Sequence, residues 1–311
     1  MKKLSGGQAA VESLKAENVG HVFGLIGSAT MEIFDALYDA EDVKFIGIRD
    51  ERTGTHMADG YARASGRPGV ILAGQNGPGA TNLVTGLAQA AAAFSPVVSI
   101  AGSLSSGHVY RDAFQEVDQQ ALFRPITKKT WTVTQTDRVP EMFREAFRVA
   151  MAPRRGPVQL NLPRDILSAT AEFGDFQAPQ SYRNQSVPAA PVEAVKQAAE
   201  MLRAAVRPVI VAGGGIKNTG GHQDALDLAE ALNAPVVTAP GHGDGRALRV
   251  QRGPRRACLA RHVLRHTVVR PMPCDQERFP VAVHDAHGIA TRTPVARQVF
   301  LRDRSYYGRG S

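Results

Sequence analysis

A carboxylate and a glycine-rich turn each follow an apolar segment, and together they could hold a small molecule. The apolar run Val43–Ile48 reads as a buried strand; Glu51 and a helix-like segment rich in small residues come directly after it. Residues 75–82, Gln-Asn-Gly-Pro-Gly-Ala-Thr-Asn, form the second signature. Ligands of parallel α/β sheets bind outside the carboxyl ends of the strands. We therefore expect Glu51 to lie over a bound small molecule, beside the turn.

The segments that must position these residues alternate between helix and strand. Helices are expected over 8–17, 31–38, 53–64, 80–93 and 140–151, and strands over 21–26, 44–48, 69–73, 96–102 and 156–162. Short apolar strands that alternate with helices predict an α/β fold, a parallel sheet with helices on both faces. We expect one domain over 1–170, a polar linker over 171–190 and an incomplete second α/β domain over 191–240.

The last 71 residues differ in composition from the rest of the chain. The net charge is +8, yet residues 241–311 hold 14 arginines, five acidic residues, and neither lysine nor asparagine. This Arg-rich tail could be a nucleic-acid arm, a disordered basic extension or out-of-frame translation of a GC-rich gene. The change of composition occurs in mid-domain, directly after an expected strand over 234–238, so we favour the out-of-frame interpretation.

Length and composition exclude several classes of protein. A chain of 311 residues can bury a large core and form about two domains. It has no run of 18 apolar residues, so no membrane-spanning helix is expected. The amino-terminal residues lack the apolar stretch of a secretory signal, which makes a cytoplasmic location the expectation. Two cysteines, Cys258 and Cys274, do not suggest a disulfide scaffold.

Five motifs in order make residues 4 to about 240 resemble thiamine diphosphate enzymes of the acetolactate synthase-like group. The motifs are Phe23-Gly24-Leu25-Ile26-Gly27-Ser28, Asp50-Glu51 with Met57–Arg63, Asn76–Asn82, Ala113-Phe114-Gln115-Glu116 with Pro125–Lys128, and Gly156–Asp165. Any one of them alone would be weak evidence. Residues 73–79 and 27–29 look closer to sulfoacetaldehyde acetyltransferase, whereas 79–86 and 124–128 look closer to acetolactate synthase, so the substrate stays open.

The resemblance implies that Glu51 is catalytic. In that family a glutamate bonds to the pyrimidine ring of thiamine diphosphate and drives it into the imino form, which removes the C2 proton of the thiazolium ring. The activated cofactor attacks a 2-oxo acid or an aldehyde, as in decarboxylases and carboligases. A dry site would strengthen the hydrogen bond. Read without the motifs, Glu51 is an ordinary exposed acid at a strand end.

The resemblance also assigns contacts to the cofactor and the substrate. Residues 1–170 would be the pyrimidine-binding domain, with cofactor contacts from Ile26, Gly27, Glu51, Gly77, Pro78 and Asn82. Phe114, Gln115 and Lys128 would lie on the substrate side. Each assignment has a plainer alternative. Ile26 and Gly27 could form a routine βα loop, and Gly77 and Pro78 a tight turn. Phe114 could be a packing side chain and Lys128 a solvated surface charge. A glycine run, Gly213–Gly215, leaves FAD open without favouring it, because it is not the full dinucleotide fingerprint.

The family's Mg²⁺ motif, Gly-Asp-Gly followed by a distant Asn, has no convincing counterpart. Gly243-Asp244-Gly245 matches three letters, but no asparagine occurs after Asn233, so we assign no metal ligand. The chain is therefore expected to be an amino-terminal fragment, inactive alone, whose Mg²⁺ and diphosphate are held by another domain. That domain would come from a homo-oligomer of the full-length protein or from a separate subunit. A basic-tailed nucleic-acid binder is the least favoured reading, and no membrane partner is expected.

Overall fold

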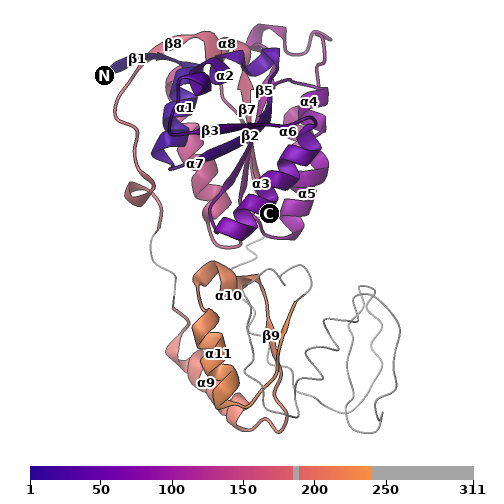
Figure 1. Cartoon of the computed structure of the whole chain (residues 1–311), viewed down its shortest axis with the longest axis vertical. Coiled ribbons are helices and arrows are strands. Elements are labelled where there is room, and N and C mark those ends of the chain that lie inside the picture. The colour runs from indigo at the N-terminus through magenta and orange to yellow at the C-terminus, as the bar shows by residue number, and fades with distance from the viewer. Residues whose placement is uncertain (185–188, 240–311) are drawn as a thin grey trace. The chain divides into compact units, whose positions relative to one another are not determined.

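The described residues form two compact units. The computed structural model describes residues 1–184 and 189–239, and the division between the units falls between these two ranges. Figure 1 shows an α/β sheet unit built from the first range and a smaller α/β unit built from the second. The Arg-rich tail, with Gly243-Asp244-Gly245 and both cysteines, lies outside the described residues.

The first unit is built on a six-stranded parallel sheet, as the sequence predicts. The strand order is β3-β2-β4-β5-β7-β6, and every neighbouring pair is parallel. The strands are β2 (His21–Leu25), β3 (Lys44–Gly47), β4 (Gly69–Ala73), β5 (Val97–Ser103), β6 (Thr130–Thr132) and β7 (Val158–Pro163). Because all six point the same way, one edge of the sheet carries all their carboxyl ends, and the opposite edge all their amino ends. We call these the carboxyl edge and the amino edge.

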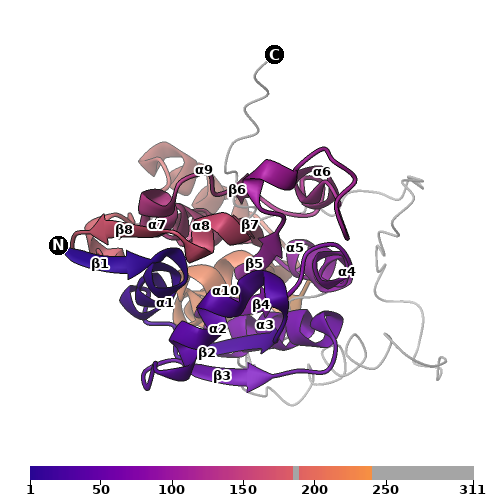
Figure 2. The ribbon, with the colours of Figure 1, turned by 90° about the horizontal axis from the view of Figure 1, so that it is seen from above.

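Helices cover both faces of this sheet, which confirms the predicted fold class. The helices of the first unit are α1 (Gly6–Ala16), α2 (Met31–Tyr38), α3 (Glu51–Ser65), α4 (Pro78–Thr81), α5 (Val84–Ala92), α6 (Gln119–Phe123), α7 (Val139–Met151) and α8 (Arg164–Ser168). The buried residues of α1, α2 and α7 pack on one face, whereas those of α3 to α6 pack on the other. Figure 2 shows α1 and α2 on one side of the strands and α4 and α5 on the other.

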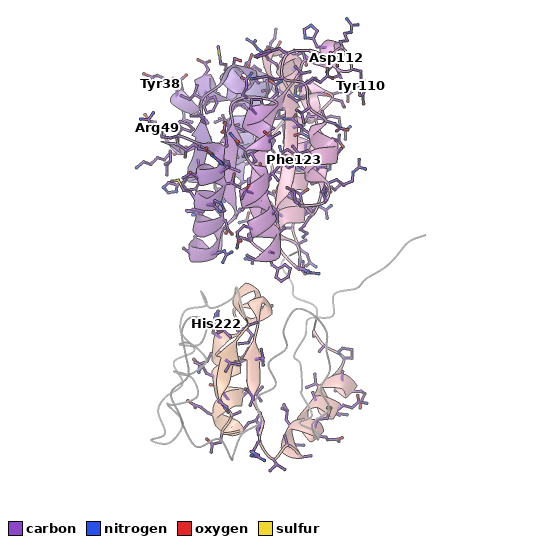
Figure 3. All side chains as sticks on the ribbon, turned by 90° about the vertical axis from the view of Figure 1, so that its right-hand side faces the viewer. Tyr38, Arg49, Tyr110, Asp112, Phe123 and His222 are labelled. Atoms are coloured by element: carbon purple, nitrogen blue, oxygen red, sulfur yellow. The ribbon has the colours of Figure 1, made fainter. Side chains whose placement is uncertain are left out.

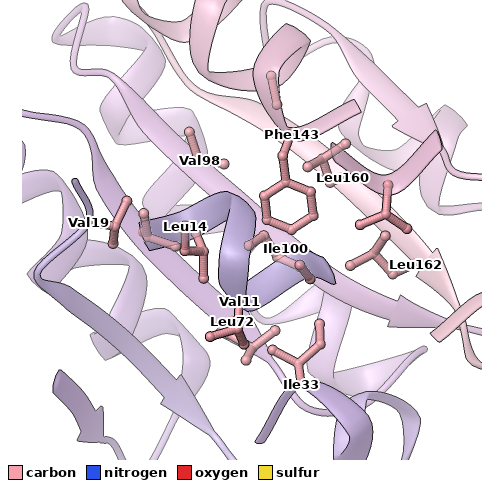
Figure 4. Close-up of a cluster of buried hydrophobic side chains, with 14 of the residues drawn as sticks. Val11, Leu14, Val19, Ile33, Leu72, Val98, Ile100, Phe143, Leu160 and Leu162 are labelled. Carbon is pink, nitrogen blue, oxygen red and sulfur yellow. The ribbon is translucent and has the colours of Figure 1, made fainter. Parts of the chain in front are cut away.

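Alternating side chains divide the apolar core between the two faces. In β4, Val70 and Leu72 belong to the cluster under α1, α2 and α7, whereas Ile71 and Ala73 belong to the cluster under α3 to α6. Successive residues of a strand point to opposite faces, so a fully apolar strand is suited to a sheet buried on both sides. Figure 4 shows the first cluster, in which Phe143 lies among strand residues.

Local hydrogen bonds fix the start of α1 and both ends of α3. Ser5 and Gln8 form a reciprocal capping box at the start of α1. Asp50 caps α3 by accepting from the backbone N–H of Arg52 at 2.8 Å, and Gly66 ends α3 in the left-handed conformation at φ 73°. These caps satisfy backbone groups that the helix leaves unpaired. The cap at Asp50 makes the next residue, Glu51, the first residue of α3.

Two strand pairings lie outside what the sequence predicted. Strand β1 (Lys2–Ser5) pairs antiparallel with β8 (Thr170–Phe173), so the first unit continues past residue 170, where a linker was expected. Arg183 also contacts the buried Glu17, which ties residues near 183 to the same unit. Strand β6 was missed as well. It lies at the sheet edge and is three residues long, which is too short to show an alternating pattern.

The second unit is small. It contains α9 (Val192–Arg203), β9 (Ile210–Ala212), α10 (Gly214–Thr219), α11 (His222–Ala231) and β10 (Val236–Thr238). Strands β9 and β10 are parallel, and five buried residues form their core: Ile210, Ala212, Ala229, Ala234 and Val236. The Gly213–Gly215 run joins β9 to α10, and FAD binding there stays a prediction.

None of the helices within residues 1–184 and 189–239 combines the length and the apolar character needed to cross a bilayer.

Candidate functional site

The loops that follow four adjacent strands meet at the carboxyl edge. Glu51 follows β3, the Ile26-Gly27 turn follows β2, the Gly77-Pro78 turn follows β4, and Phe114 lies in the loop after β5. Because β3, β2, β4 and β5 are neighbours in the sheet, their following loops are neighbours too. The parallel topology therefore brings together residues that are up to 88 positions apart in the chain.

Glu51 is almost completely buried and is held by one hydrogen bond. Its side chain has one oxygen, Oε2, that accepts from Nδ2 of Asn82 at 3.0 Å, and only 5% of the residue is exposed. Among residues 1–184 and 189–239, the other oxygen, Oε1, has no hydrogen-bond partner. A carboxylate at the first residue of a helix is favoured by the helix dipole. The helix and Asn82 thus stabilise the carboxylate while one oxygen stays available to a ligand.

The turn after β4 leaves room beside that free oxygen. Gly77 adopts φ +52°, and a Cβ there would lie 2.6 Å from the carbonyl oxygen of Gln115. Pro78 begins α4, where its missing N–H costs nothing. A Cβ at Gly79 would lie 3.3 Å from Oε1 of Glu51. The glycines therefore allow the turn to pack closely against the loop after β5 and keep the surroundings of Oε1 open.

The turn after β2 is packed against the same β4 turn. A Cβ on Gly27 would lie 2.5 Å from the backbone of Gly74, and Ala29 donates its N–H to the Gly74 carbonyl at 2.9 Å. Ile26 is 66% exposed, although it is apolar. The predicted contact residues Ile26 and Gly27 thus lie at the carboxyl edge, with Ile26 facing outward.

The predicted substrate-side residues are separated by the structure. Phe114 and Gln115 lie next to the Gly77 turn, where Phe114 is 81% exposed. Lys128 precedes β6 and therefore lies at the amino edge, away from Glu51. Its Nζ donates to the carbonyls of Val149 and Ala152, at the end of α7. Burial lowers the pKa of Lys128 to about 8. This placement differs from the substrate-side position expected from the motif.

Sequence reasoning missed the amide network that joins three of the loops. Gln75 accepts from the Ser28 hydroxyl at 2.9 Å and donates to Oε1 of Gln115 at 2.8 Å. Asn76 donates to the carbonyls of Phe114 and Gln115 at 3.2 and 3.0 Å. The available signal was the Gln-Asn pair directly before Gly77, in a strand-to-helix turn where amides can bond backbone groups.

This arrangement suits a flat, partly polar ligand. A nearly buried carboxylate can accept one hydrogen bond from a ring nitrogen through Oε1. An exposed Ile and an exposed Phe offer apolar contact. Charge-assisted hydrogen bonds are stronger where water is excluded. Such a site can therefore polarise one nitrogen of a heteroaromatic ring and leave the rest of the ligand free to react.

Comparison with known families identifies the class of protein. The model described as "Thiamine pyrophosphate enzyme, N-terminal TPP binding domain" matches residues 4–122, and the model described as "Thiamine pyrophosphate enzyme, central domain" matches residues 195–245. The two matches follow the order of the two structural units. The chain belongs to the thiamine pyrophosphate enzymes, which confirms the resemblance found in the sequence.

Individual relatives narrow the class to proteins that resemble acetolactate synthase. The chain is 40% identical over 240 residues to a probable acetolactate synthase large subunit of Methanocaldococcus jannaschii, covering 76% of this chain and 40% of that protein. It is 38% identical over 240 residues to the acetolactate synthase isozyme 3 large subunit of Escherichia coli, covering 76% and 42%. The chain thus spans about two-fifths of the length of these relatives.

Proposed function

We propose that the first unit supplies the pyrimidine side of a thiamine diphosphate site. The observation that carries the proposal is the pairing of Glu51 with Asn82, which leaves Oε1 available in a nearly dry environment. When bound, the cofactor supplies a nucleophilic carbon for attack on the carbonyl of a 2-oxo acid or an aldehyde. The reaction class is therefore that of a decarboxylase or carboligase.

Glu51 has the central role among the chain's own residues in this proposal. Its Oε1 accepts a hydrogen bond from a ring nitrogen, and Asn82 holds the carboxylate in position through Oε2. Gly27 and Gly77 let the backbone approach the ring closely, and Pro78 fixes the start of α4 beside it. Ile26 provides apolar contact at the exposed rim. Water exclusion around Glu51 strengthens the hydrogen bond that it accepts.

Phe114 and Gln115 form the substrate side in this proposal. The Gln115 amide can orient a carbonyl or carboxylate, and the Phe114 ring can cover the apolar part of a small acid or aldehyde. Their loop is joined by hydrogen bonds to the turn that packs beside Glu51. Lys128 has no part in it, because its Nζ is already bonded at the end of α7.

The diphosphate and Mg²⁺ are proposed to be held by a different domain. Within the described part of the chain, no group of three His, Cys, Asp or Glu side chains is arranged to hold a metal ion. Mg²⁺ on a diphosphate requires hard oxygen ligands. We infer that the chain acts as the amino-terminal part of a longer enzyme, or with a separate subunit, so that each site needs both. Co-purification of a diphosphate-binding chain would favour the separate subunit.

A hybrid enzyme tests the proposal. In it, residues 1–239 of this chain replace the matching part of the M. jannaschii relative, and turnover of a 2-oxo acid is measured. We expect a folded hybrid with measurable turnover that needs added thiamine diphosphate and Mg²⁺. The parent relative serves as the positive control. A hybrid that folds and assembles like its parent, yet has no turnover with any 2-oxo acid or aldehyde tried, would contradict the proposed function.

A further inference from the structure

The loop after β5 adopts an unfavourable backbone conformation that side-chain contacts must hold in place. Three of its residues that are not glycine have positive φ: Tyr110 at 63°, Asp112 at 49° and Gln115 at 61°. Side chains disfavour this region, and clusters of such residues persist only where surrounding contacts hold them. Tyr110 is 94% exposed, and Figure 3 shows Tyr110 and Asp112 projecting from the end of the first unit, whereas Phe123 lies inside it. Tyr110 and Asp112 are both exposed, so hydrogen bonds and not burial of these two side chains must hold the loop.

Glu116 supports the loop from within. One of its carboxylate oxygens accepts the N–H of Tyr110 at 2.6 Å, and the other accepts the N–H groups of Ala113 and Arg111 at 3.1 and 3.3 Å. These donors hold the pKa of Glu116 below its usual range. A single ionised side chain thus gathers three backbone amides of its own loop, a strong arrangement because each bond is charge-assisted.

Asn76 supports the same loop from the neighbouring turn. It is 6% exposed, and both of its Nδ2 hydrogen bonds go to loop carbonyls, those of Phe114 and Gln115. Its next neighbour is Gly77, which has no Cβ to obstruct the Gln115 carbonyl. The β4 turn that passes beside Glu51 is therefore the same turn that fixes the loop bearing Phe114 and Gln115.

We propose that Asn76 and Glu116 are positioning residues that hold Phe114 and Gln115 in a fixed arrangement beside the Glu51 turn. This inference rests on the proposed function, which makes Phe114 and Gln115 the residues that contact the substrate. Neither Asn76 nor Glu116 touches the substrate. Together they keep the exposed Phe114 ring and the half-buried Gln115 amide ready to receive a small carbonyl compound, so that little ordering of the loop is needed when it binds.

Hydrogen exchange in the full chain tests the structural part without any activity. Glu116→Gln removes the charge that binds three amides, and Asn76→Asp replaces an NH₂ donor with a carboxylate facing two carbonyls. We expect amide exchange at Tyr110, Arg111 and Ala113 to become at least about tenfold faster in each variant, with exchange in β4 and β5 unchanged. Glu12→Gln, an acid of α1 paired with Lys15, is the control and should leave the loop unaltered. Unchanged loop exchange in both variants would overturn the proposal.

Kinetics in the hybrid enzyme test the positioning role itself. We expect Asn76→Asp to raise KM for the carbonyl substrate at least about tenfold. The thiamine diphosphate concentration that gives half-maximal activity should stay within about twofold of the unmodified hybrid. Glu51→Gln in the same hybrid distinguishes a failure of the positioning proposal from a failure of the proposed function. If Glu51→Gln abolishes turnover but Asn76→Asp leaves KM unchanged, the positioning proposal fails alone. If Glu51→Gln retains turnover, the proposed function fails, whatever the loop shows.

Discussion

The two edges of the parallel sheet differ in the surroundings of their buried polar side chains. At the amino edge, Lys128 bonds the end of α7 and Oε2 of Glu17 pairs with Arg183, whereas Oε1 of Glu17 is buried without a hydrogen-bond partner among the described residues. At the carboxyl edge, Glu51 keeps one oxygen without a partner among the described residues, and Phe114 stays exposed. Buried polar groups are usually paired. Each edge thus holds a carboxylate oxygen without a hydrogen bond, but that of Glu17 is sealed inside the unit, whereas that of Glu51 lies beside Gly79 in an open turn. The carboxyl edge is therefore the one suited to a ligand.

The strongest way to break this comparison is to remove the charge of Glu51. In the hybrid enzyme, Glu51→Gln keeps the shape and the contact with Asn82 but weakens the acceptor. We expect kcat to fall by about 10²–10⁴-fold, the size typical of losing one acid–base group, because the remaining amide cannot favour a protonated ring nitrogen. Steady-state kinetics at saturating thiamine diphosphate measure the effect. A kcat within about threefold of the unmodified hybrid would refute the role given to Glu51.

A second test concerns the glycines of the carboxyl edge. Gly77→Ala must adopt positive φ and place a Cβ against the Gln115 carbonyl, so we expect the first unit to lose about 2–4 kcal/mol of unfolding free energy. The matched control is Gly60→Ala, in α3 with open space around it. It should gain about 0.5–1 kcal/mol, because alanine favours the helix. Trp131, the one tryptophan of the sequence, lies in β6 and reports urea unfolding of the first unit. Equal effects of the two substitutions would count against the packing described for Gly77.

A third test concerns the buried side chain of Glu17 at the amino edge. Burial raises the pKa of Glu17 from 4.5 to about 7, against the opposing effect of Arg183. Between pH 4.5 and 7 the folded chain keeps a proton that the unfolded chain has released, so on this account stability falls as the pH rises through that window. Glu17→Gln should remove this slope, a change of about 1–3 kcal/mol between the two pH values. The check is urea unfolding followed by Trp131 at several pH values. An unchanged slope would show that Glu17 does not titrate as described.

The smallest expected effect is at Lys128. Lys128→Met removes two hydrogen bonds to carbonyls at the end of α7, so we expect a loss of about 1 kcal/mol of stability. In the hybrid enzyme KM for the carbonyl substrate should stay within about twofold. Urea unfolding and steady-state kinetics measure the two quantities. A tenfold rise in KM with normal stability would instead restore the substrate-side role that the motif suggested.

Local patterns predicted most of the fold. Helix α2 and strand β4 begin and end at the expected residues, because α2 has clear apolar periodicity and β4 is a short, uninterrupted apolar run. The pairing of β1 with β8 joins residues about 168 positions apart and has no local signature. Strand β6 is too short for a pattern. Pairing between distant segments depends on the packing of the whole unit, which one-dimensional periodicity does not encode.

The site was predicted where it depends on topology and missed where it depends on side-chain contacts. Glu51 and Asn82 meet, with Gly79 of the β4 turn beside them, because the carboxyl ends of neighbouring parallel strands meet. The bonds from Asn76 to the loop at Phe114 link residues 38 positions apart through rotamers that no spacing reveals. Lys128 was grouped with Phe114 and Gln115 through the family motif alone, whereas in the structure it precedes β6 and therefore lies at the amino edge.

The central claim is that the free oxygen of Glu51 acts on the ring of bound thiamine diphosphate. The most direct measurement is the rate at which the C2 hydrogen of the bound cofactor exchanges with deuterium in the hybrid enzyme, followed by NMR after rapid acid quench. We predict that Glu51→Gln slows this exchange at least about a hundredfold, whereas Glu17→Gln, at the opposite edge, leaves it within about twofold. Equal exchange rates in the unmodified hybrid and in Glu51→Gln would contradict the account.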